Sequence, residues 1–270
     1  MRIVFQGVPG AYSEVAARQL FPKTKPVGLP TFSDVFSEVA KRRADRGVIP
    51  IENSLTGSIH ENYDLLEKHA IGIVGEIKLR IRHSLLALPG TSLSDVREVY
   101  SHPQGLLQCA GFLKRLPRAK PMAYFDTAGS ARLLAERKLK GAAAIASDSA
   151  AGIYHLKTLK RGIEDNRHNY TRFLVLSLAK PKRSRAASKT SLLFTLKNLP
   201  GALYLSLGCF AERKIQLLKV ESRPIPGRPW EYRFYLDFGD SAWSAQARAA
   251  LKALERSARD LRVLGSYPPA

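Results

Sequence analysis

Cysteine is scarce in this 270-residue chain, and its scarcity limits what the two sulfur atoms can do. Cys109 and Cys209 lie far apart, with no partner motif around either of them. Free cysteine is among the most buried residue types, and both positions fall in helix-like stretches. We therefore expect each to be a small core residue rather than a nucleophile or a metal ligand.

Long apolar runs and cofactor motifs are also missing. No run of about 18 apolar residues occurs, which argues against a transmembrane helix and a membrane partner. A dinucleotide-binding G-x-G-x-x-G turn and a phosphate loop are absent, and the six histidines show no metal-ligand spacing. A strand-like segment begins at Arg2 and leaves no room for a targeting peptide. The sequence predicts a cytoplasmic protein with no metal and no organic cofactor.

Acidic residues are few relative to basic ones. The chain has 43 Lys and Arg against 23 Asp and Glu, a formal net charge of +20. Such an excess fits nucleic-acid binding, attraction of a small anionic substrate, or a solvated basic surface. No zinc finger, helix-turn-helix or RNA-binding aromatic motif accompanies the charge, so a nucleic-acid partner is not expected.

Most of the chain alternates strand and helix patterns. Strands are expected at 2–6, 47–51, up to 101, 122–125, 142–146 and 171–177, with one alternating segment at 71–83. Helices are expected at 11–20, from 33, at 104–116, at 127–137 and near 149. This alternation predicts an α/β fold with parallel strands, arranged as two lobes around a cleft.

The C-terminal part has a pattern of its own. Strands are expected at 190–196, 215–222, 231–239 and 262–266, and helices at 201–213 and 247–261. The order β-α-β-β-α-β is that of a ferredoxin-like domain. A polar, basic stretch at 180–189 without apolar periodicity separates it from the rest and is expected to be a linker.

Polar residues follow several of the expected strands at their carboxyl ends, where open α/β sheets bind ligands. The five segments are 7–13, 52–54, 101–104, 126–128 and 147–149. Any one of them is explained by helix capping, whereas five in one domain favour an anion-binding cleft. Arg172, after Thr171 at the last strand, can bind a carboxylate with two parallel hydrogen bonds.

Taken together, these segments resemble the prephenate dehydratase family with a C-terminal ACT domain. The resemblance covers nearly the whole chain in order, and it is carried by seven short motifs that are weak singly and specific together. They lie at 7–14, 49–57, 101–104, 144–147, Asn169 with 171–173, 201–203 and 221–224. Two departures occur: Gly105 stands where the family usually has Ala, and 126–130 is an altered Thr-Ala element.

The resemblance implies a domain organisation. A catalytic domain of the periplasmic-binding-protein type would cover 1–179, with one lobe at about 1–77 and 165–179 and the other at about 78–164. The linker would be 180–189 and the ACT regulatory domain 190–270. The implied reaction converts prephenate to phenylpyruvate with loss of water and CO₂, a lyase step of phenylalanine biosynthesis that needs no cofactor.

The resemblance also implies roles for single residues. Thr171, Arg172 and Phe173 would be catalytic: Thr171 would polarise or protonate the leaving hydroxyl, and Arg172 would hold a carboxylate. Substrate-binding residues would be Asn53, Ser54, Ser101, Gln104 and Thr127. Glu52 stays open between a structural role and repulsion of the wrong substrate charge state. The effector phenylalanine would bind between two ACT domains, in a homodimer or homotetramer, at Gly201, Ala202, Leu203, Glu221, Ser222, Arg223 and Pro224.

Other functions stay open at this point. Arogenate, which carries an amine where prephenate carries a keto group, is an alternative substrate. A non-catalytic ligand-sensing binding protein would also need two lobes and Arg172, but it would have no need of Thr171.

Overall fold

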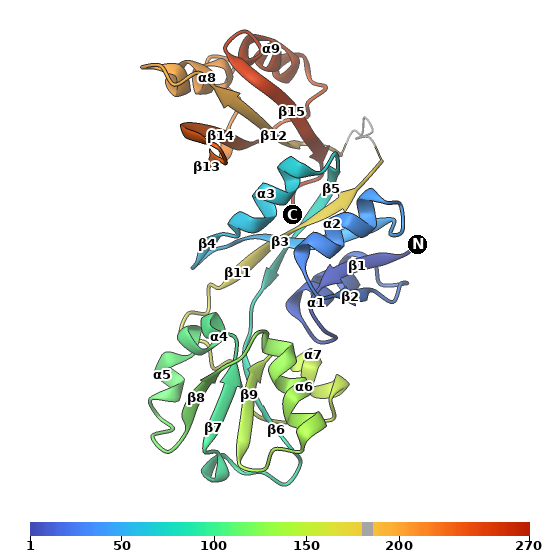
Figure 1. The fold of residues 1–270 in the computed structure, drawn as a ribbon, viewed down its shortest axis with the longest axis vertical. Coiled ribbons are helices and arrows are strands. Elements are labelled where there is room, and N and C mark those ends of the chain that lie inside the picture. Colours follow the sequence, from blue (N-terminus) through green and yellow to red (C-terminus); the bar gives the residue numbers. More distant parts are fainter. Residues whose placement is uncertain (180–185) are drawn as a thin grey trace. The chain divides into compact units, whose positions relative to one another are not determined.

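The computed structural model describes residues 1–179 and 186–270, drawn in Figure 1. They form two compact units, each made of several stretches of chain. One unit comprises Met1–Val35, Val48–Ser58 and Lys78–Phe173; the other comprises Phe36–Gly47, Ile59–Ile77 and Leu174–Ala270. The predicted linker 180–189 falls mostly outside the described residues, and the predicted division into lobes, linker and ACT domain stays a prediction. No described helix is long and apolar enough to cross a membrane.

The first sheet has the strand order β2-β1-β3-β11-β5, with β4 paired to β3. Its strands are β1 (Ile3–Gln6), β2 (Val27–Leu29), β3 (Arg46–Asn53), β4 (Gly57–Ser58), β5 (Gly72–Arg80) and β11 (Tyr170–Ser177). The helices α1 (Tyr12–Leu20), α2 (Phe32–Ala40) and α3 (His60–Lys68) alternate with them. Because β11 is inserted beside β3, a segment from late in the chain lies next to the end of β3.

The second sheet has the order β10-β6-β9-β7-β8. Its strands are β6 (Ser84–Ala87), β7 (Glu98–Ser101), β8 (Lys120–Ala123), β9 (Ala142–Ala146) and β10 (Lys157–Arg161). Strand β7 is parallel to β8 and β9, whereas β6 is antiparallel to β9 and β10. Helices α4 (Pro103–Gln108) and α5 (Ala110–Leu113) lie on one face, and α6 (Thr127–Arg137) and α7 (Asp148–Ile153) on the other (Figure 1).

A buried apolar cluster fills each face of this second sheet. Phe112 and Leu113 of α5 pack with Val99 and Ile145 on one side. On the opposite side, Leu134 of α6 packs with alanines of β9. Alternate side chains of one strand point to opposite faces, so strands covered by helices on both faces are apolar throughout. This accounts for the continuous run Ala142–Ala146, all of which is buried.

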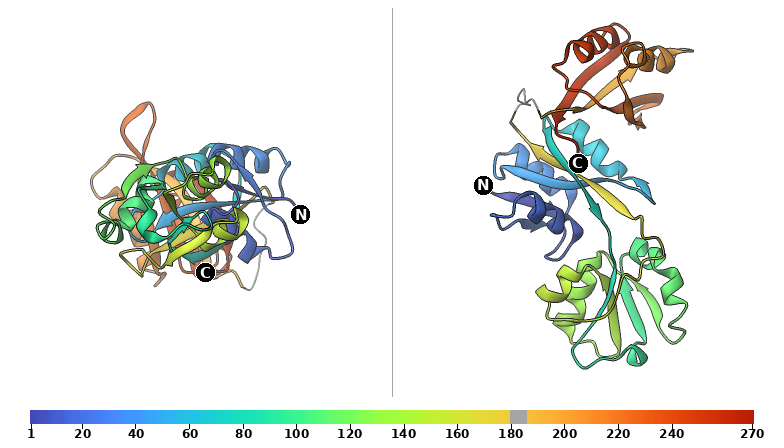
Figure 2. Two further views of the ribbon diagram at one scale, coloured as in Figure 1. Left: turned by 90° about the horizontal axis from the view of Figure 1, so that it is seen from below. Right: turned by 180° about the vertical axis from the view of Figure 1, so that it is seen from behind.

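The C-terminal sheet has the order β13-β14-β12-β15. It consists of β12 (Lys189–Leu196), β13 (Leu217–Ile225), β14 (Arg228–Phe238) and β15 (Ala258–Tyr267), with α8 (Ala202–Ala211) and α9 (Ala245–Leu254). Both helices contribute to one apolar core with the sheet, including Phe194, Phe210 and Leu254. The β-α-β-β-α-β order is therefore as predicted, and Figure 2 shows the same domain from two further directions.

Several expected elements differ from the structure, and three differences are instructive. The predicted helix 104–116 is interrupted at Cys109, which has non-helical dihedrals, and so becomes α4 and α5. The predicted last helix 247–261 was too long: α9 ends at Leu254, and residues from Ala258 onward pair with β12 instead. Pairing along the whole of β12 needs a longer partner than the predicted strand 262–266. The first residue of β12 is Lys189, which had been assigned to the linker.

Candidate active site

Asn53, the last residue of β3, is the centre of a buried hydrogen-bond cluster in the first unit. Its amide nitrogen Nδ2 lies 2.7 Å from Oδ1 of Asn169, 3.0 Å from Oγ1 of Thr171 and 3.2 Å from the Tyr170 carbonyl. Asn53, Asn169 and Thr171 are all buried. The insertion of β11 beside β3 is what brings these residues together, although 116 or more positions separate Asn53 from its partners.

The orientation of the Asn53 amide is fixed from its other side. Its oxygen Oδ1 accepts hydrogen bonds from the backbone N–H groups of Leu55, at 3.0 Å, and Thr56, at 3.1 Å. Only an oxygen can accept two N–H donors, so the NH₂ group must face Thr171. The Thr171 oxygen therefore accepts a hydrogen bond from Asn53. Its own O–H hydrogen is left to point at another acceptor.

Ser54 ties the same loop to the segment before β11. Its hydroxyl donates to the His168 carbonyl at 3.0 Å and accepts from the Tyr170 backbone N–H at 2.9 Å. Its own N–H donates to the Tyr170 carbonyl at 2.8 Å. Ser54 thus fixes the backbone on either side of Asn169, next to Thr171. Its hydroxyl already has one donor partner and one acceptor partner in this arrangement.

Arg172 and Phe173 follow Thr171 on β11 and are both buried. The Arg172 guanidinium nitrogen Nη2 lies 3.4 Å from Oε2 of Glu52, the residue before Asn53. The ion pair keeps the charge of Arg172 compensated, and Glu52 is the more exposed partner, at 35% against 9% for the Arg172 side chain. A substrate carboxylate at Arg172 would have to share this guanidinium with Glu52 or replace it. Phe173 packs in the core at 1% exposure.

The remaining predicted substrate-binding residues lie on the second sheet of the same unit, and no described hydrogen bond connects them to Asn53 or Thr171. Ser101 ends β7, is fully buried and donates to the Ile145 carbonyl at 2.8 Å. Gln104 is exposed near the start of α4. Thr127 opens α6, beside the capping residue Asp126.

Gly105, the departure noted in the sequence, lies against Ser101. A Cβ atom at Gly105 would lie 2.6 Å from the Ser101 hydroxyl oxygen and 3.4 Å from Cγ2 of Thr127. The first distance is closer than real Cβ contacts allow, so an alanine would require Ser101 to move. The missing side chain of Gly105 thus leaves space for the Ser101 hydroxyl beside Thr127. This effect on packing comes in addition to the expected change in helix propensity.

The loop after β1 packs against the helix starts of the second sheet. The Gly10 carbonyl accepts a hydrogen bond from Ser147 Oγ at 2.7 Å, and the Pro9 carbonyl accepts one from the Tyr154 hydroxyl at 2.8 Å. Gly10 has a φ of +89°, and a Cβ there would lie 2.9 Å from Ala150. Only glycine combines that dihedral with that approach. The predicted polar strand ends 7–13 and 147–149 are therefore neighbours.

Asp126 caps α6 at the same place, accepting a hydrogen bond from the Ala128 backbone N–H at 3.2 Å. Burial raises the pKa of its carboxyl, against the effect of the N–H donors around it. A carboxyl held there is easier to protonate than an exposed aspartate.

Sequence reasoning missed a second buried network around His83. The imidazole Nδ1 lies 3.0 Å from the Tyr12 hydroxyl, and Nε2 lies 2.9 Å from Oε1 of Gln108. Burial lowers the pKa of His83 and raises that of Tyr12, so both groups are neutral at pH 7. Tyr12 belongs to the glycine-rich motif that was singled out, whereas His83 had been assigned only a position on a strand face.

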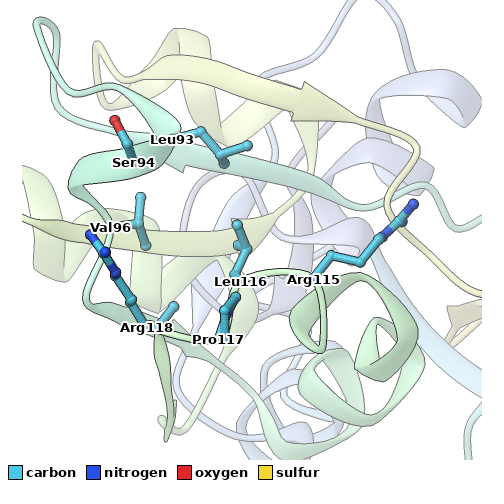
Figure 3. A pocket seen from close by; sticks show the side chains of 8 residues that line it. Leu93, Ser94, Val96, Arg115, Leu116, Pro117 and Arg118 are labelled. Carbon is cyan, nitrogen blue, oxygen red and sulfur yellow. The ribbon is translucent and has the colours of Figure 1, made fainter.

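A cavity of about 560 Å³ elsewhere in the first unit contains none of the predicted site residues. Its lining is largely apolar, from Leu93, Val96, Leu116 and Pro117 among others (Figure 3). Among the described residues, no three His, Cys, Asp or Glu side chains gather as metal ligands. Cys109 is buried, with a pKa raised by burial, and Cys209 is partly buried, which agrees with their expected roles in cores.

The predicted effector residues lie in two places on the C-terminal domain. Gly201 is the N-cap of α8, and Ala202 and Leu203 line a cavity of about 100 Å³ together with Trp230 and Tyr232. Glu221, Ser222, Arg223 and Pro224 lie on β13, an edge strand of the sheet. The second group does not face the first within one chain: Arg223 and Glu221 contact α3 instead.

The contacts with α3 are specific. Arg223 forms a two-pronged pair with Asp64, with Nε–Oδ1 at 3.0 Å and Nη2–Oδ2 at 2.8 Å. His60 Nε2 lies 3.2 Å from Oε1 of Glu221, and the Tyr235 hydroxyl donates to the Tyr63 carbonyl at 2.7 Å. Helix α3 begins at His60, seven positions after Asn53. The C-terminal sheet thus contacts the helix that follows the loop after Asn53.

Comparison with known proteins identifies the family. The prephenate dehydratase family profile matches residues 3–181. The chain belongs to the prephenate dehydratase family. It is 46% identical to arogenate dehydratase/prephenate dehydratase 2, chloroplastic, of Arabidopsis thaliana, over 99% of this chain and 73% of that one. It is 45% identical to arogenate dehydratase 2 of Petunia hybrida, over 99% and 72%. Such dehydratases are lyases, and so the chain is an enzyme of that class.

Solved structures give the same family. Prephenate dehydratase from Arthrobacter aurescens, in complex with L-Phe, superposes with a TM-score of 0.91 at 28% identity, over 99% of this chain and 90% of that one. A protein described as GqqA, a quorum quenching acylase, superposes with a TM-score of 0.93 at 34% identity, over 100% and 98%. One fold and a shared family sequence thus accompany more than one described activity, so this chain's substrate has to be argued from its site.

Proposed function

We propose that this protein is a prephenate dehydratase that forms phenylpyruvate. In this reaction the bond to the ring carboxylate breaks, its electron pair enters the ring, and the 4-hydroxyl leaves as water after accepting one proton. The gain of aromaticity drives the step, so the protein has to bind an anion and assist the leaving hydroxyl. The observation that carries the proposal is the Asn53–Thr171 pair, because Asn53 donates to the Thr171 oxygen and leaves the Thr171 O–H to donate to another acceptor.

Each residue of the cluster has a defined part in the proposed reaction. Thr171 donates a hydrogen bond to the leaving hydroxyl, which stabilises the oxygen as its bond to the ring breaks. A threonine is too weak an acid to act alone, and the hydrogen bond from Asn53 to Oγ1 stabilises negative charge on that oxygen. Arg172 binds a substrate carboxylate in exchange for Glu52. Ser54 and Asn169 hold the backbone and the amide that set this geometry.

Arogenate is the second candidate substrate, and the names of the similar plant proteins favour it. Those proteins are described as arogenate dehydratases, some of them also as prephenate dehydratases. Turnover of arogenate would give phenylalanine directly. The two substrates differ only in an amine or keto group, so the same Thr171 chemistry serves both.

One experiment tests the proposal and separates the substrates. Purified protein is mixed with prephenate and, separately, with arogenate, and phenylpyruvate and phenylalanine are quantified over time. We expect turnover of prephenate, with the ratio of kcat/KM values ranking the two substrates. Failure to convert either compound would reject the dehydratase proposal and favour a ligand-binding protein.

We further propose that phenylalanine regulates the enzyme through the C-terminal domain of a homodimer or homotetramer. Exposed apolar side chains, including Leu199, Tyr204, Leu205 and Trp230, surround the start of α8, which is a surface suited to a second copy. The related Arthrobacter enzyme was crystallised with L-Phe. The contacts of Arg223 and Glu221 with α3 would carry the signal to the Asn53 loop.

A further inference from the structure

Two connecting segments of the first unit enclose a cavity that the proposed reaction does not use. One segment, 81–83, runs from β5 to β6, and the other, 162–169, runs from β10 to β11. They are held to each other by hydrogen bonds from Ile81 N–H to the Asn169 carbonyl, at 2.8 Å, and from Ile163 N–H to the His83 carbonyl, at 3.1 Å. The cavity measures about 510 Å³ and is lined by Arg80, Arg82, Arg161, Gly162, Glu164, Arg167, His168 and Tyr170.

The lining carries a large excess of positive charge. Four guanidinium groups face one carboxylate, that of Glu164, and Glu164 is itself occupied by the His83 backbone N–H at 2.9 Å. Arg161 pairs with Asp148 at 3.0 Å. Within the part of the chain that the structure describes, no ion pair or hydrogen bond involves the guanidinium groups of Arg80, Arg82 or Arg167, although the Arg82 carbonyl accepts a hydrogen bond from the Tyr12 hydroxyl. Like charges that line one cavity repel each other, and a bound anion would relieve that repulsion.

The side chain of Arg80 is an independent indication of an anion site. Its Nε atom is shielded from solvent yet has no hydrogen-bond acceptor among the described residues. A buried donor without an acceptor is destabilising, because it has lost its hydrogen bonds to water and gained none in the protein. A bound anion would supply oxygen acceptors in this cavity. Guanidinium forks match carboxylate and phosphate groups in particular.

We propose that this cavity binds a small polyanion with two or more negative charges, whether a phosphate compound or a polycarboxylate. The site is separate from the active site, because none of the residues assigned to catalysis or substrate binding lines it. It is also adjacent to the active site, since Tyr170 lines the cavity and immediately precedes Thr171. An anion bridging the two connecting segments would therefore stabilise the backbone that presents Thr171.

The test uses isothermal titration calorimetry on the full-length protein at low ionic strength, with pyrophosphate and citrate as separate probes. We expect one equivalent of at least one probe to bind, and the probe that binds more tightly identifies the chemistry of the ligand. The double variant Arg82→Gln/Arg167→Gln should weaken binding at least ~10-fold, because it removes two guanidinium forks. Arg118→Gln, which removes one exposed arginine outside the cavity, should change it by no more than about twofold.

Further measurements separate a loss of the anion site from a loss of folding. Thermal melting shows whether the double variant is folded, and Arg82→Lys, which keeps the charge but loses the fork, should give an intermediate affinity. Binding should persist in Thr171→Ala and in the presence of saturating prephenate. The proposal is overturned if neither probe binds, if Arg118→Gln weakens binding as much as the double variant, or if prephenate displaces the anion.

Discussion

At the scale of single residues, the proposed reaction depends on the Thr171 hydroxyl as a hydrogen-bond donor to the substrate. Thr171→Ala removes the proposed donor, and we expect kcat to fall by about 10²–10⁴-fold with the melting temperature little changed. Thr171→Ser keeps a hydroxyl and should retain part of the rate. Steady-state kinetics with prephenate measure both. An unchanged kcat in Thr171→Ala would remove the residue from its role.

Asn53→Asp gives a sharper form of the same prediction. Aspartate keeps the oxygen that accepts from Leu55 and Thr56, but it has no NH₂ group to donate to Thr171, to Asn169 Oδ1 or to the Tyr170 carbonyl. The Thr171 hydroxyl would then donate to the aspartate rather than to substrate. Thermal melting shows whether the variant stays folded. We expect kcat to fall nearly as far as in Thr171→Ala, and the double variant to be no slower than Thr171→Ala alone. Additive losses would contradict the coupling.

His83 predicts how stability depends on pH. Burial lowers its pKa in the folded state, so between that pKa and the unfolded value of about 6.5 the unfolded chain binds more protons. Its contribution is therefore present above about pH 6.5 and is lost as pH falls below that value. Urea unfolding at pH 7.5 and 5.5 should show a smaller loss for His83→Gln than for wild type. His168→Gln, at an exposed histidine, serves as the control and should keep the wild-type pH dependence.

At this scale the sequence selected residues that lie together, but it did not predict their contacts. Asn53, Ser54, Thr171 and Arg172 were predicted, and the structure brings all four together. The Ser101 hydroxyl, by contrast, donates to the Ile145 carbonyl. Asn169 was singled out as part of a motif but was given no role, and His83 was not selected. The hydrogen-bond partner of a hydroxyl or an imidazole is often a residue far away in the chain. A single sequence does not show which distant residues lie next to each other in space.

At the scale of elements, α3 connects the C-terminal sheet to the active-site loop. Arg223→Ala breaks the pair with Asp64, and both partners are partly exposed, so we expect a modest loss of stability, up to about 1 kcal/mol. Its larger effect should be on regulation. If phenylalanine inhibits through this contact, the concentration giving half inhibition should rise several-fold while kcat without phenylalanine is preserved.

A charge reversal checks that prediction. Arg223→Asp alone should weaken inhibition further, because it places two carboxylates side by side. Arg223→Asp combined with Asp64→Arg should restore part of it. Arg248→Ala, at an exposed arginine of α9, is the matched control. Equal inhibition of the wild type, the two Arg223→Asp proteins and Arg248→Ala would show that phenylalanine does not act through the contact between Arg223 and Asp64.

The sequence predicted the elements with strong local signals and missed those without them. Helix α6 was predicted with its correct bounds, because Asp126 caps it and its apolar positions repeat at helical spacing. Helix α3 was not predicted: its N-cap, Ile59, makes no side-chain capping bond, and the contacts of its polar face come from another part of the chain. The end of α9 was misplaced because β12, rather than local propensity, determines that 258–261 are extended.

At the scale of the whole molecule, a buried ion pair in the second unit holds β5 to β12. Lys189 Nζ lies 2.8 and 3.0 Å from the two carboxylate oxygens of Glu76, whose side chain is fully buried. Glu76→Gln leaves a buried cation without its main counter-charge, and the expected loss is about 3–5 kcal/mol in the free energy of unfolding. Urea denaturation measures it. Glu136→Gln, in an exposed pair with Arg132, should cost no more than about 0.5 kcal/mol.

The order of strands across the molecule was beyond the sequence. Alternating apolar patterns predicted α/β lobes and a ferredoxin-like domain, and both architectures are present. The patterns could not show that β11 inserts between β3 and β5, because every buried strand offers similar apolar faces to its neighbours. The site depends on that one choice of neighbour.

The grip of β13 and β14 on α3 has a consequence for descent. A recombination event within 180–189 would exchange the C-terminal 80 or so residues as a block, but Asp64, Tyr63 and His60 would stay behind with the other parent. The incoming domain would then lack its matched partners on α3. We therefore expect an exchange of the C-terminal domain to succeed only where α3 changes with it.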